Sequence, residues 1–262
     1  MSLPGVGRVA LVTGAARGIG AATVRALAAD GWSVVATDRC SDDPRLRYPL
    51  GTRDELEALA GDQVVTCVAD TCVAADLAAA VAVAEERFGG LDAALAVAGV
   101  VAGGVPLWEQ DPEQLSAVLE VDLHGVVLLA RVTIPALLRR PAPRSGRFVA
   151  VSSAAATRGL PMLAGYCAAK AGVNGLVRGL AAELRGTGVT ASCVSPGSTR
   201  TPVLEESARL YGLADVEHFA RQQPLERLLE PEEVAAALVW LAGPASSGVT
   251  GADVAVDGGL AL

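Results

Sequence analysis

Short apolar runs alternate along this chain with longer segments rich in alanine and leucine. The short runs are rich in β-branched residues without strict apolar–polar alternation, which is typical of strands buried on both faces. They predict strands over residues 8–12, 33–37, 63–68, 93–98, 146–152, 189–194 and 253–256. The longer segments predict helices over residues 18–30, 54–60, 74–88, 112–138, 166–185 and 231–241. This order predicts an α/β fold, a doubly wound parallel sheet with helices on both faces.

Neither a Gly/Ser-rich linker nor a block of charge interrupts the alternation, so we expect residues 1–262 to form a single domain. One segment departs from the pattern. Residues 39–52 insert proline, aspartate and arginine between the second strand and its helix, and residues 40–51 read CSDDPRLRYPLG.

The composition narrows the class of partner. Hydrophobic residues make up 52% of the chain and charged residues 19%, which excludes disorder and predicts a large core. With 29 acidic and 21 basic residues the formal charge is −8, and aromatic residues are only 3%. An acidic chain with few aromatic side chains offers a phosphate backbone neither attraction nor stacking. We therefore expect no nucleic-acid partner.

Metal, disulfide and membrane signals are weak. The five cysteines are scattered without a CxxC pair, and the two histidines lie far apart, so we expect no metal site and no disulfide framework. The N-terminus lacks a basic region and a cleavage motif, and charges or glycines interrupt every apolar run before it reaches about 18 residues. We expect a cytoplasmic protein with no membrane partner.

A glycine-rich turn follows the first predicted strand and opens the first helix: residues 13–20 read TGAARGIG. Gly14 permits a tight turn, Gly18 lets backbone N–H groups approach a pyrophosphate, and Gly20 permits close packing of helix on strand. The helix N-terminus adds a partial positive charge toward the phosphates. A glycine triplet alone is a weak signal, and its strand–turn–helix context is what points to a dinucleotide.

Acidic residues end the next two strands. Asp38 lies 18 positions after Gly20, where a carboxylate accepts hydrogen bonds from the adenosine ribose hydroxyls and repels a 2′-phosphate, so it favours NAD over NADP. The alternatives are an Asp that merely starts a turn, or phosphate binding by Arg39. Asp70 either faces the adenine or caps the following helix.

Three residues form a candidate catalytic set. Tyr166 and Lys170 are four positions apart on a predicted helix and therefore share one face, and Ser153 follows the fifth strand. A phenol with a pKa near ~10 is a poor base, but an adjacent ammonium lowers that pKa by about 1–3 units. Lys170 is the only lysine in the chain, which uses arginine everywhere else. A surface Tyr/Lys pair is the alternative interpretation.

These motifs together resemble the short-chain dehydrogenase/reductase family, a Rossmann-fold family, over nearly the whole chain. The resemblance extends to Pro196–Thr201, read PGSTRT, after the sixth strand. It implies that Tyr166 is the acid/base, that Ser153 polarises the substrate oxygen and that Lys170 binds the nicotinamide ribose. The loop after the sixth strand, with the Thr201 hydroxyl, would hold the carboxamide.

The full set of expected site residues follows from these motifs and the resemblance. The catalytic set is Ser153, Tyr166, Lys170 and Asp122. The cofactor-binding set is Gly14, Arg17, Gly18, Ile19, Gly20, Asp38, Arg39, Asp70, Thr71, Ala98, Gly99, Tyr166, Lys170, Pro196, Gly197, Thr199 and Thr201.

Two positions depart from the family pattern. Residues 96–99 read AVAG where the family usually has Asn-Asn-Ala-Gly, and Asp122 stands where it usually has an Asn that supports a proton-relay water. An Asp accepts from water but supplies no amide donor, and its charge near Lys170 would alter the pKa of Tyr166. The relay is therefore in question, whereas the Ser–Tyr–Lys set is intact.

A narrower resemblance concerns residues 47–52, 100–109, 154–161 and 195–211, which are similar to the mycofactocin-coupled branch of the family. That branch implies NAD held tightly and electrons passed to mycofactocin as an external carrier. We then expect residues 40–51 to act as a lid over the cofactor, with Tyr48 and Leu50 covering the adenine and Arg45 or Arg47 reaching a phosphate.

The expected function is NAD-dependent interconversion of an alcohol and a carbonyl compound. Residues 100–105, 154–163 and 202–223, within a substrate-loop region of 200–223, predict a mostly apolar pocket suited to a hydrophobic alcohol rather than a sugar or an anion; the apolar side chains are Val101, Leu160, Met162, Leu204, Tyr211 and Phe219. The alternatives are an NADPH-dependent carbonyl or 3-oxoacyl reductase, and an NAD-binding regulator without catalysis. Apolar helix surfaces and a glycine-rich C-terminal stretch predict a homotetramer.

Overall fold

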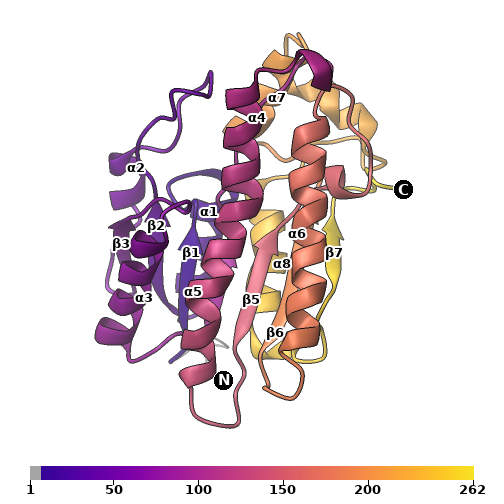
Figure 1. Cartoon of the computed structure of the whole chain (residues 1–262). Coiled ribbons are helices and arrows are strands. Elements are labelled where there is room, and N and C mark those ends of the chain that lie inside the picture. The colour runs from indigo at the N-terminus through magenta and orange to yellow at the C-terminus, as the bar shows by residue number, and fades with distance from the viewer. Residues whose placement is uncertain (1–6) are drawn as a thin grey trace.

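The sheet of this protein has seven parallel strands in the order β3-β2-β1-β4-β5-β6-β7 (Figure 1), in a computed structural model that describes residues 7–262. The strands are β1 (Val9–Thr13), β2 (Ser33–Asp38), β3 (Val64–Val68), β4 (Ala93–Ala96), β5 (Arg147–Val151), β6 (Thr190–Pro196) and β7 (Asp253–Val256). The prediction of a doubly wound parallel sheet in an α/β fold is confirmed.

Helices cover both faces of the sheet. One face carries α3 (Ala74–Phe88), α5 (Gly125–Arg139) and α6 (Ala164–Glu183), and the other carries α1 (Gly18–Ala29), α2 (Arg53–Glu57) and α8 (Pro231–Ala242) (Figure 1). Within β5, Phe148 and Ala150 pack on the first set of helices, whereas Val149 and Val151 pack on the second. Because both faces are buried, both parities of each strand must be apolar, which explains the unalternating runs.

The helix predicted over residues 112–138 is one long helix with an irregular turn in its middle. It comprises α4 (Pro112–Leu119), a π-helical turn over Glu120–His124, and α5. A π turn adds one residue to the helical repeat and is found mostly at functional positions. In this protein the π turn carries Asp122, and the sequence did not predict the position of the turn.

By length and composition alone, the helix over residues 112–139 would suffice to cross a membrane. In the fold this helix packs on α3, β4 and β5, so a place in the protein core accounts for its apolar character.

Other boundaries also differ from the prediction. Helix α6 begins two residues early, at Ala164, and β4 ends at Ala96 because the chain leaves the sheet there. Helix α7 (Pro202–Leu210) was not predicted as a helix, although Thr201 caps it and proline opens it. Residues 39–52 contain no helix or strand, as expected of an insertion.

Candidate active site

A cavity of about 560 Å³ lies at the carboxyl ends of the strands. Strands β1 to β3 extend the sheet in one direction, and β4 to β7 extend it in the other. The connections that follow the neighbouring strands β1 and β4 therefore run to opposite faces of the sheet. Ligands bind at such a switch point in open α/β sheets. Every residue that the sequence predicted for catalysis or cofactor binding lines this cavity.

The glycine-rich turn has the backbone that its sequence predicted. Gly14 and Gly18 have φ values of +65° and +56°, which side chains disfavour. A Cβ on Gly14 would lie 2.5 Å from the Ala98 Cα, and one on Gly20 would overlap the Gly14 carbonyl. The turn therefore presents bare backbone at the N-terminus of α1, which fits a pyrophosphate.

Asp38 lies at the cavity wall beside this turn. Its carboxylate accepts hydrogen bonds from the amides of Ala16, at 3.1 Å, and Cys40, at 3.2 Å. These bonds fix the carboxylate at the position where a ribose hydroxyl is expected. The donor set of backbone amides and a fixed carboxylate fits the adenosine half of NAD.

Asp70 does not cap the following helix, so that alternative is wrong. The N-cap of α3 is Val73, and Asp70 instead accepts a hydrogen bond from the Cys72 amide at 2.8 Å. Its other oxygen lies 3.4 Å from the Arg39 Nε. Asp70 and Thr71 both line the cavity, and contact of Asp70 with the adenine stays a prediction.

The catalytic candidates meet at the end of β5. Ser153 follows the strand and accepts a hydrogen bond from the Ala155 amide, while Tyr166 and Lys170 lie one turn apart on α6. The Lys170 Nζ donates to the Val151 carbonyl at 3.2 Å and lies 5.6 Å from the centre of the Tyr166 ring. Lys170 is only 3% exposed, so the alternative of a surface Tyr/Lys pair is wrong.

Asp122 enters the same site from the π turn. Its side chain is fully buried, one oxygen accepts from the Val100 amide at 2.7 Å, and the other lies 3.5 Å from the Lys170 Nζ. That second oxygen has no hydrogen-bond partner among the described residues. A Cβ on Gly99 would lie 3.3 Å from the Lys170 Nζ, so a glycine at this point leaves room for the pair.

Burial and charge set the protonation of these three groups. Burial raises the pKa of Tyr166, Lys170 lowers it, and Asp122 raises it again, so that the net pKa is above that of a free phenol. Lys170 does lower the pKa of Tyr166, as expected, but burial and Asp122 raise it by more. Burial lowers the pKa of Lys170, but Asp122 and Tyr166 outweigh this and raise it. Burial likewise raises the pKa of Asp122 despite the attraction of Lys170.

The loop after β6 closes the other side of the cavity. Thr201, expected to hold a carboxamide, uses its hydroxyl to cap α7 by accepting from the Leu204 amide and donates to the Thr199 carbonyl at 3.2 Å. Sequence reasoning missed Gln223, a buried side chain that accepts from the Ser198 amide at 2.7 Å. No local pattern links residues so far apart along the chain.

The insertion forms a strap, here defined as residues 39–52, across the cavity. Tyr48 reaches the catalytic end, where its hydroxyl accepts a hydrogen bond from the Val101 amide at 3.1 Å, and it packs with Leu46 and Val100. Tyr48 was expected to cover the adenine, and its hydroxyl in addition contacts the backbone of Val101. Arg17, expected to bind cofactor, donates to the Pro49 carbonyl at 2.5 Å and so ties the glycine turn to the strap.

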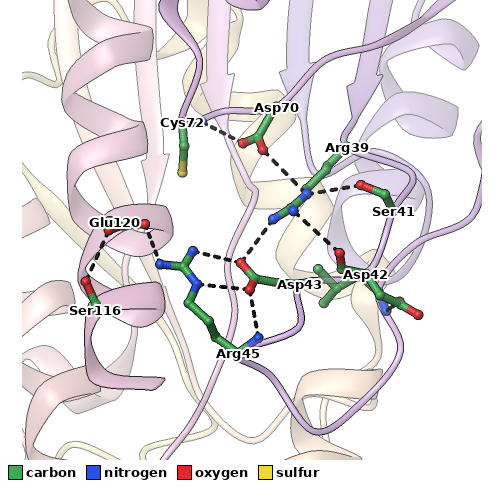
Figure 2. A network of polar contacts seen from close by, with 10 residues as sticks. Arg39, Ser41, Asp42, Asp43, Arg45, Asp70, Cys72, Ser116 and Glu120 are labelled. Carbon is green, nitrogen blue, oxygen red and sulfur yellow. Dashed lines mark hydrogen bonds and ion pairs between the residues drawn. The ribbon is translucent and has the colours of Figure 1, made fainter. Parts of the chain in front are cut away.

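Arg45, expected to reach a phosphate, has two carboxylate partners within the protein. It forms ion pairs with Asp43 at 2.8 Å and with Glu120 of the π turn at 2.7 Å (Figure 2). The strap is thus fastened to the helix turn that also carries Asp122. Its sequence showed charged residues but did not show which of them would pair.

Apolar residues dominate the substrate end of the cavity, as predicted. Leu160, Leu204, Tyr211 and Phe219 line it, together with Leu163 and Leu213. Val101 and Met162 do not line it, contrary to expectation; Val101 is buried behind the wall, and Met162 lies outside it with a backbone φ of +59°.

Comparison with known proteins agrees with this geometry. A family model described as enoyl-(acyl carrier protein) reductase matches residues 14–261. The chain is 40% identical to cis-4-hydroxycyclohexanecarboxylate dehydrogenase of Sinomonas cyclohexanicum, over 96% of each chain. It is 34% identical to 2,5-dichloro-2,5-cyclohexadiene-1,4-diol dehydrogenase of Sphingobium indicum, over 97% of this chain and 96% of the other.

A solved structure of 3-ketoacyl-(acyl-carrier-protein) reductase from Brucella melitensis, complexed with NADH, superposes with a TM-score of 0.86 at 30% identity, covering 98% of this chain and 99% of the other. The fold, the cavity and these matches define an oxidoreductase with a Rossmann fold. The chain belongs to the short-chain dehydrogenase/reductase family.

Replacing Tyr166 by Phe removes the phenolic oxygen and keeps the ring. We expect turnover to fall by about 10²–10⁴-fold because the proton-transfer group is lost, with NAD binding retained. Steady-state kinetics and nucleotide titration measure the two effects. A variant that kept half its activity would assign the acid/base role to another residue.

Replacing Asp122 by Asn removes the negative charge that raises the Tyr166 pKa. Alcohol oxidation needs the phenolate, so its rate rises with pH through the Tyr166 pKa; without Asp122 that pKa falls, and the rising limb moves to lower pH. A pH–rate profile measures this. Glu113→Gln, an exposed acid on α4, is the matched control and should leave the limb in place. An unmoved limb in the Asp122 variant would contradict the electrostatic role.

Proposed function

We propose that this protein is an NAD-dependent alcohol dehydrogenase that interconverts an alcohol and its carbonyl compound. One observation carries the proposal: Ser153, Tyr166 and Lys170 line the same cavity as the glycine-rich turn and Asp38. A dinucleotide seated on that turn and a substrate at Ser153 would therefore share one enclosed space. Two rival functions, an NADPH-dependent reductase and an NAD-binding regulator, lack a comparable observation in their favour.

The chemistry divides between the cofactor and the chain. NAD⁺, held by the glycine-rich turn and Asp38, would supply the acceptor for the hydride of the carbinol carbon. The Ser153 hydroxyl orients the substrate oxygen, and the Tyr166 phenolate takes the hydroxyl proton as the carbonyl forms. Lys170 holds a positive charge beside the phenolate, and Asp122 keeps that ammonium charged and in place. In the reverse direction Tyr166 returns the proton to the oxygen.

An alicyclic secondary alcohol is the substrate class we propose. The relatives at 40% and 34% identity are named for cyclohexane and cyclohexadiene alcohols, and the apolar side chains of this cavity suit such a ring. Arg158 is the one cation at the substrate end of the described cavity, where it donates to the Leu260 carbonyl at 2.5 Å. Its charge would accommodate a carboxylate on the far side of the ring, a proposal that departs from the sequence-based expectation of a hydrophobic alcohol rather than an anion.

A panel of alcohols tests this function and the role of Arg158. We expect NAD-dependent oxidation of cyclohexanol and of 4-hydroxycyclohexanecarboxylate, with an artificial electron acceptor supplied. Replacing Arg158 by Gln should raise KM for the carboxylate by about 10-fold or more and leave that for cyclohexanol unchanged, because only the carboxylate uses the cation. Arg131→Gln, on the exposed face of α5, is the control. Failure of every alcohol with NAD bound would favour the regulator.

Tight retention of NAD and transfer of electrons to mycofactocin are the finer part of the proposal. The strap supports retention because it lines the cavity and is held to the rest of the protein at three points. Within the strap, Pro49 accepts a hydrogen bond from Arg17, Tyr48 accepts one from the Val101 amide, and Arg45 donates one to Glu120. Cofactor release then requires these contacts to break, which slows dissociation more than association. An external carrier such as mycofactocin would reoxidise the held cofactor.

Replacing residues 45–50 by a short Gly/Ser turn tests retention. We expect the variant to lose its nucleotide during purification and to turn over with added NAD, because the fastening contacts are gone. Exchange of labelled NAD measures both proteins, and Arg53→Gln, which removes an exposed ion pair just outside the strap, is the control. Exchange within seconds in the unmodified enzyme, with steady reduction of free NAD, would refute retention.

We also propose a cytoplasmic homotetramer. Strand β7 ends the sheet, and Trp240 on the neighbouring α8 is 43% exposed. On α6, a Cβ added to Gly175 or to Gly179 would meet no other atom within 4 Å. Such a sheet edge and such open apolar faces are suited to contact between subunits.

A further inference from the structure

Arg39 stands directly after Asp38, at the adenosine end of the cavity. A guanidinium in this place is chemically suited to a phosphate, because its planar fork binds phosphate oxygens in pairs. Asp38 favours NAD, whereas Arg39 would favour NADP. These two residues alone therefore do not determine which cofactor binds.

The strap removes this ambiguity by occupying Arg39 (Figure 2). Its Nη1 donates to the Asp43 carboxylate at 3.0 Å, its Nε donates to the Ser41 hydroxyl at 3.1 Å, and its Nη2 donates to the Asp42 carbonyl at 3.4 Å. The Nε also lies 3.4 Å from the Asp70 carboxylate. Two carboxylates thus surround one cation.

Asp43 is the centre of this arrangement. Its side chain is 2% exposed, and its two oxygens accept from Arg39 and, three times, from the backbone amide and guanidinium of Arg45. A buried carboxylate without both arginines would be an uncompensated charge, so Asp43 and its partners hold one another in place. If Arg39 moved away to bind a phosphate, the buried Asp43 carboxylate would lose one of its two cationic partners.

We propose that Asp43 is a specificity-determining residue for the cofactor: by holding Arg39 in the strap, it denies a 2′-phosphate the cation that would bind it. Asp38 repels the phosphate directly, and Asp43 acts on it through Arg39. This inference rests on the proposed use of NAD, and it adds a residue of the strap to the selection that the end of β2 begins.

Equilibrium binding of NAD and NADP to protein freed of nucleotide tests the proposal without knowledge of the substrate. Asp43→Asn keeps the shape of the side chain and its acceptor for the Arg45 amide but removes the charge that holds Arg39. We expect the Kd ratio of NADP to NAD to fall by about 10- to 100-fold, the range of a charge-assisted hydrogen bond to phosphate. In the double variant Asp43→Asn with Arg39→Gln, the ratio should return to the value of the unmodified protein.

Two matched variants separate this effect from its alternatives. Asp42→Asn removes the same charge from the same loop, but the Asp42 carboxylate bonds the Leu50 amide and does not hold Arg39, so the ratio should stay within about 3-fold. Glu120→Gln removes the ion pair that fastens the strap to the π turn, while Asp43 keeps both Arg45 and Arg39, and the ratio should again stay. A fall in either variant as large as in Asp43→Asn would overturn the proposal, because general charge or strap opening would then suffice.

Arg39→Gln in the otherwise unmodified protein keeps the test decisive even if Asp43→Asn fails to fold. The proposal expects no change in the Kd ratio, because Arg39 is already withheld from the phosphate. A tenfold weakening of NADP alone would show that Arg39 binds the phosphate and would overturn the proposal. Failure of the unmodified protein to bind NAD would overturn the proposed function as well, whereas normal NAD binding with an unchanged ratio in Asp43→Asn refutes only the role of Asp43.

Discussion

The architecture of this site depends on one buried cation. The Lys170 side chain is almost fully buried, and an isolated charge there would be unstable, so its surroundings must supply acceptors. They come from separate parts of the chain: the Val151 carbonyl at the end of β5 and the Asp122 carboxylate from the π turn. The sheet, α6 and the long helix must therefore be in register for the charge to be tolerated, and that same register places the phenol of Tyr166 in the cavity.

Asp122 stands where the family resemblance leads us to expect Asn, and its carboxylate favours the charged form of Lys170 but disfavours that of Tyr166. An amide would leave Lys170 with one fewer anionic partner, whereas the carboxylate keeps the ammonium charged. The same carboxylate raises the pKa of the phenol and so weakens the assistance that Lys170 gives. The expected result is an enzyme whose alcohol oxidation favours higher pH. The Asp122 oxygen that faces Lys170 accepts no hydrogen bond from the described residues, so it is also an acceptor suited to water, which keeps a proton relay chemically feasible.

The strap connects the two ends of the cavity. Asp43 and Arg39 lie at the adenosine end, Tyr48 lies at the catalytic end, and Arg45 joins the strap to the π turn of the long helix. Cofactor selection, cofactor retention and the position of Asp122 thus share one short segment without regular secondary structure. Ion pairs hold it in place of a hydrogen-bonded ladder, so its stability depends on mutual charge compensation rather than on backbone propensity.

The sequence by itself determined the parallel sheet, the glycine-rich turn, Asp38 and the Ser153–Tyr166–Lys170 set. Each of these features depends on residues that are close together in the sequence. The pattern of apolar residues indicates which faces of a strand or helix are buried, glycines indicate a tight turn, and a four-residue spacing places two side chains on one face of a helix. Tertiary structure alone decided that Asp122 pairs with Lys170, that Asp43 holds Arg39 and that Tyr48 reaches Val101. These contacts join residues whose partners depend on how loops cross the sheet edge, and a charged residue in a loop does not specify which of several opposite charges it will meet.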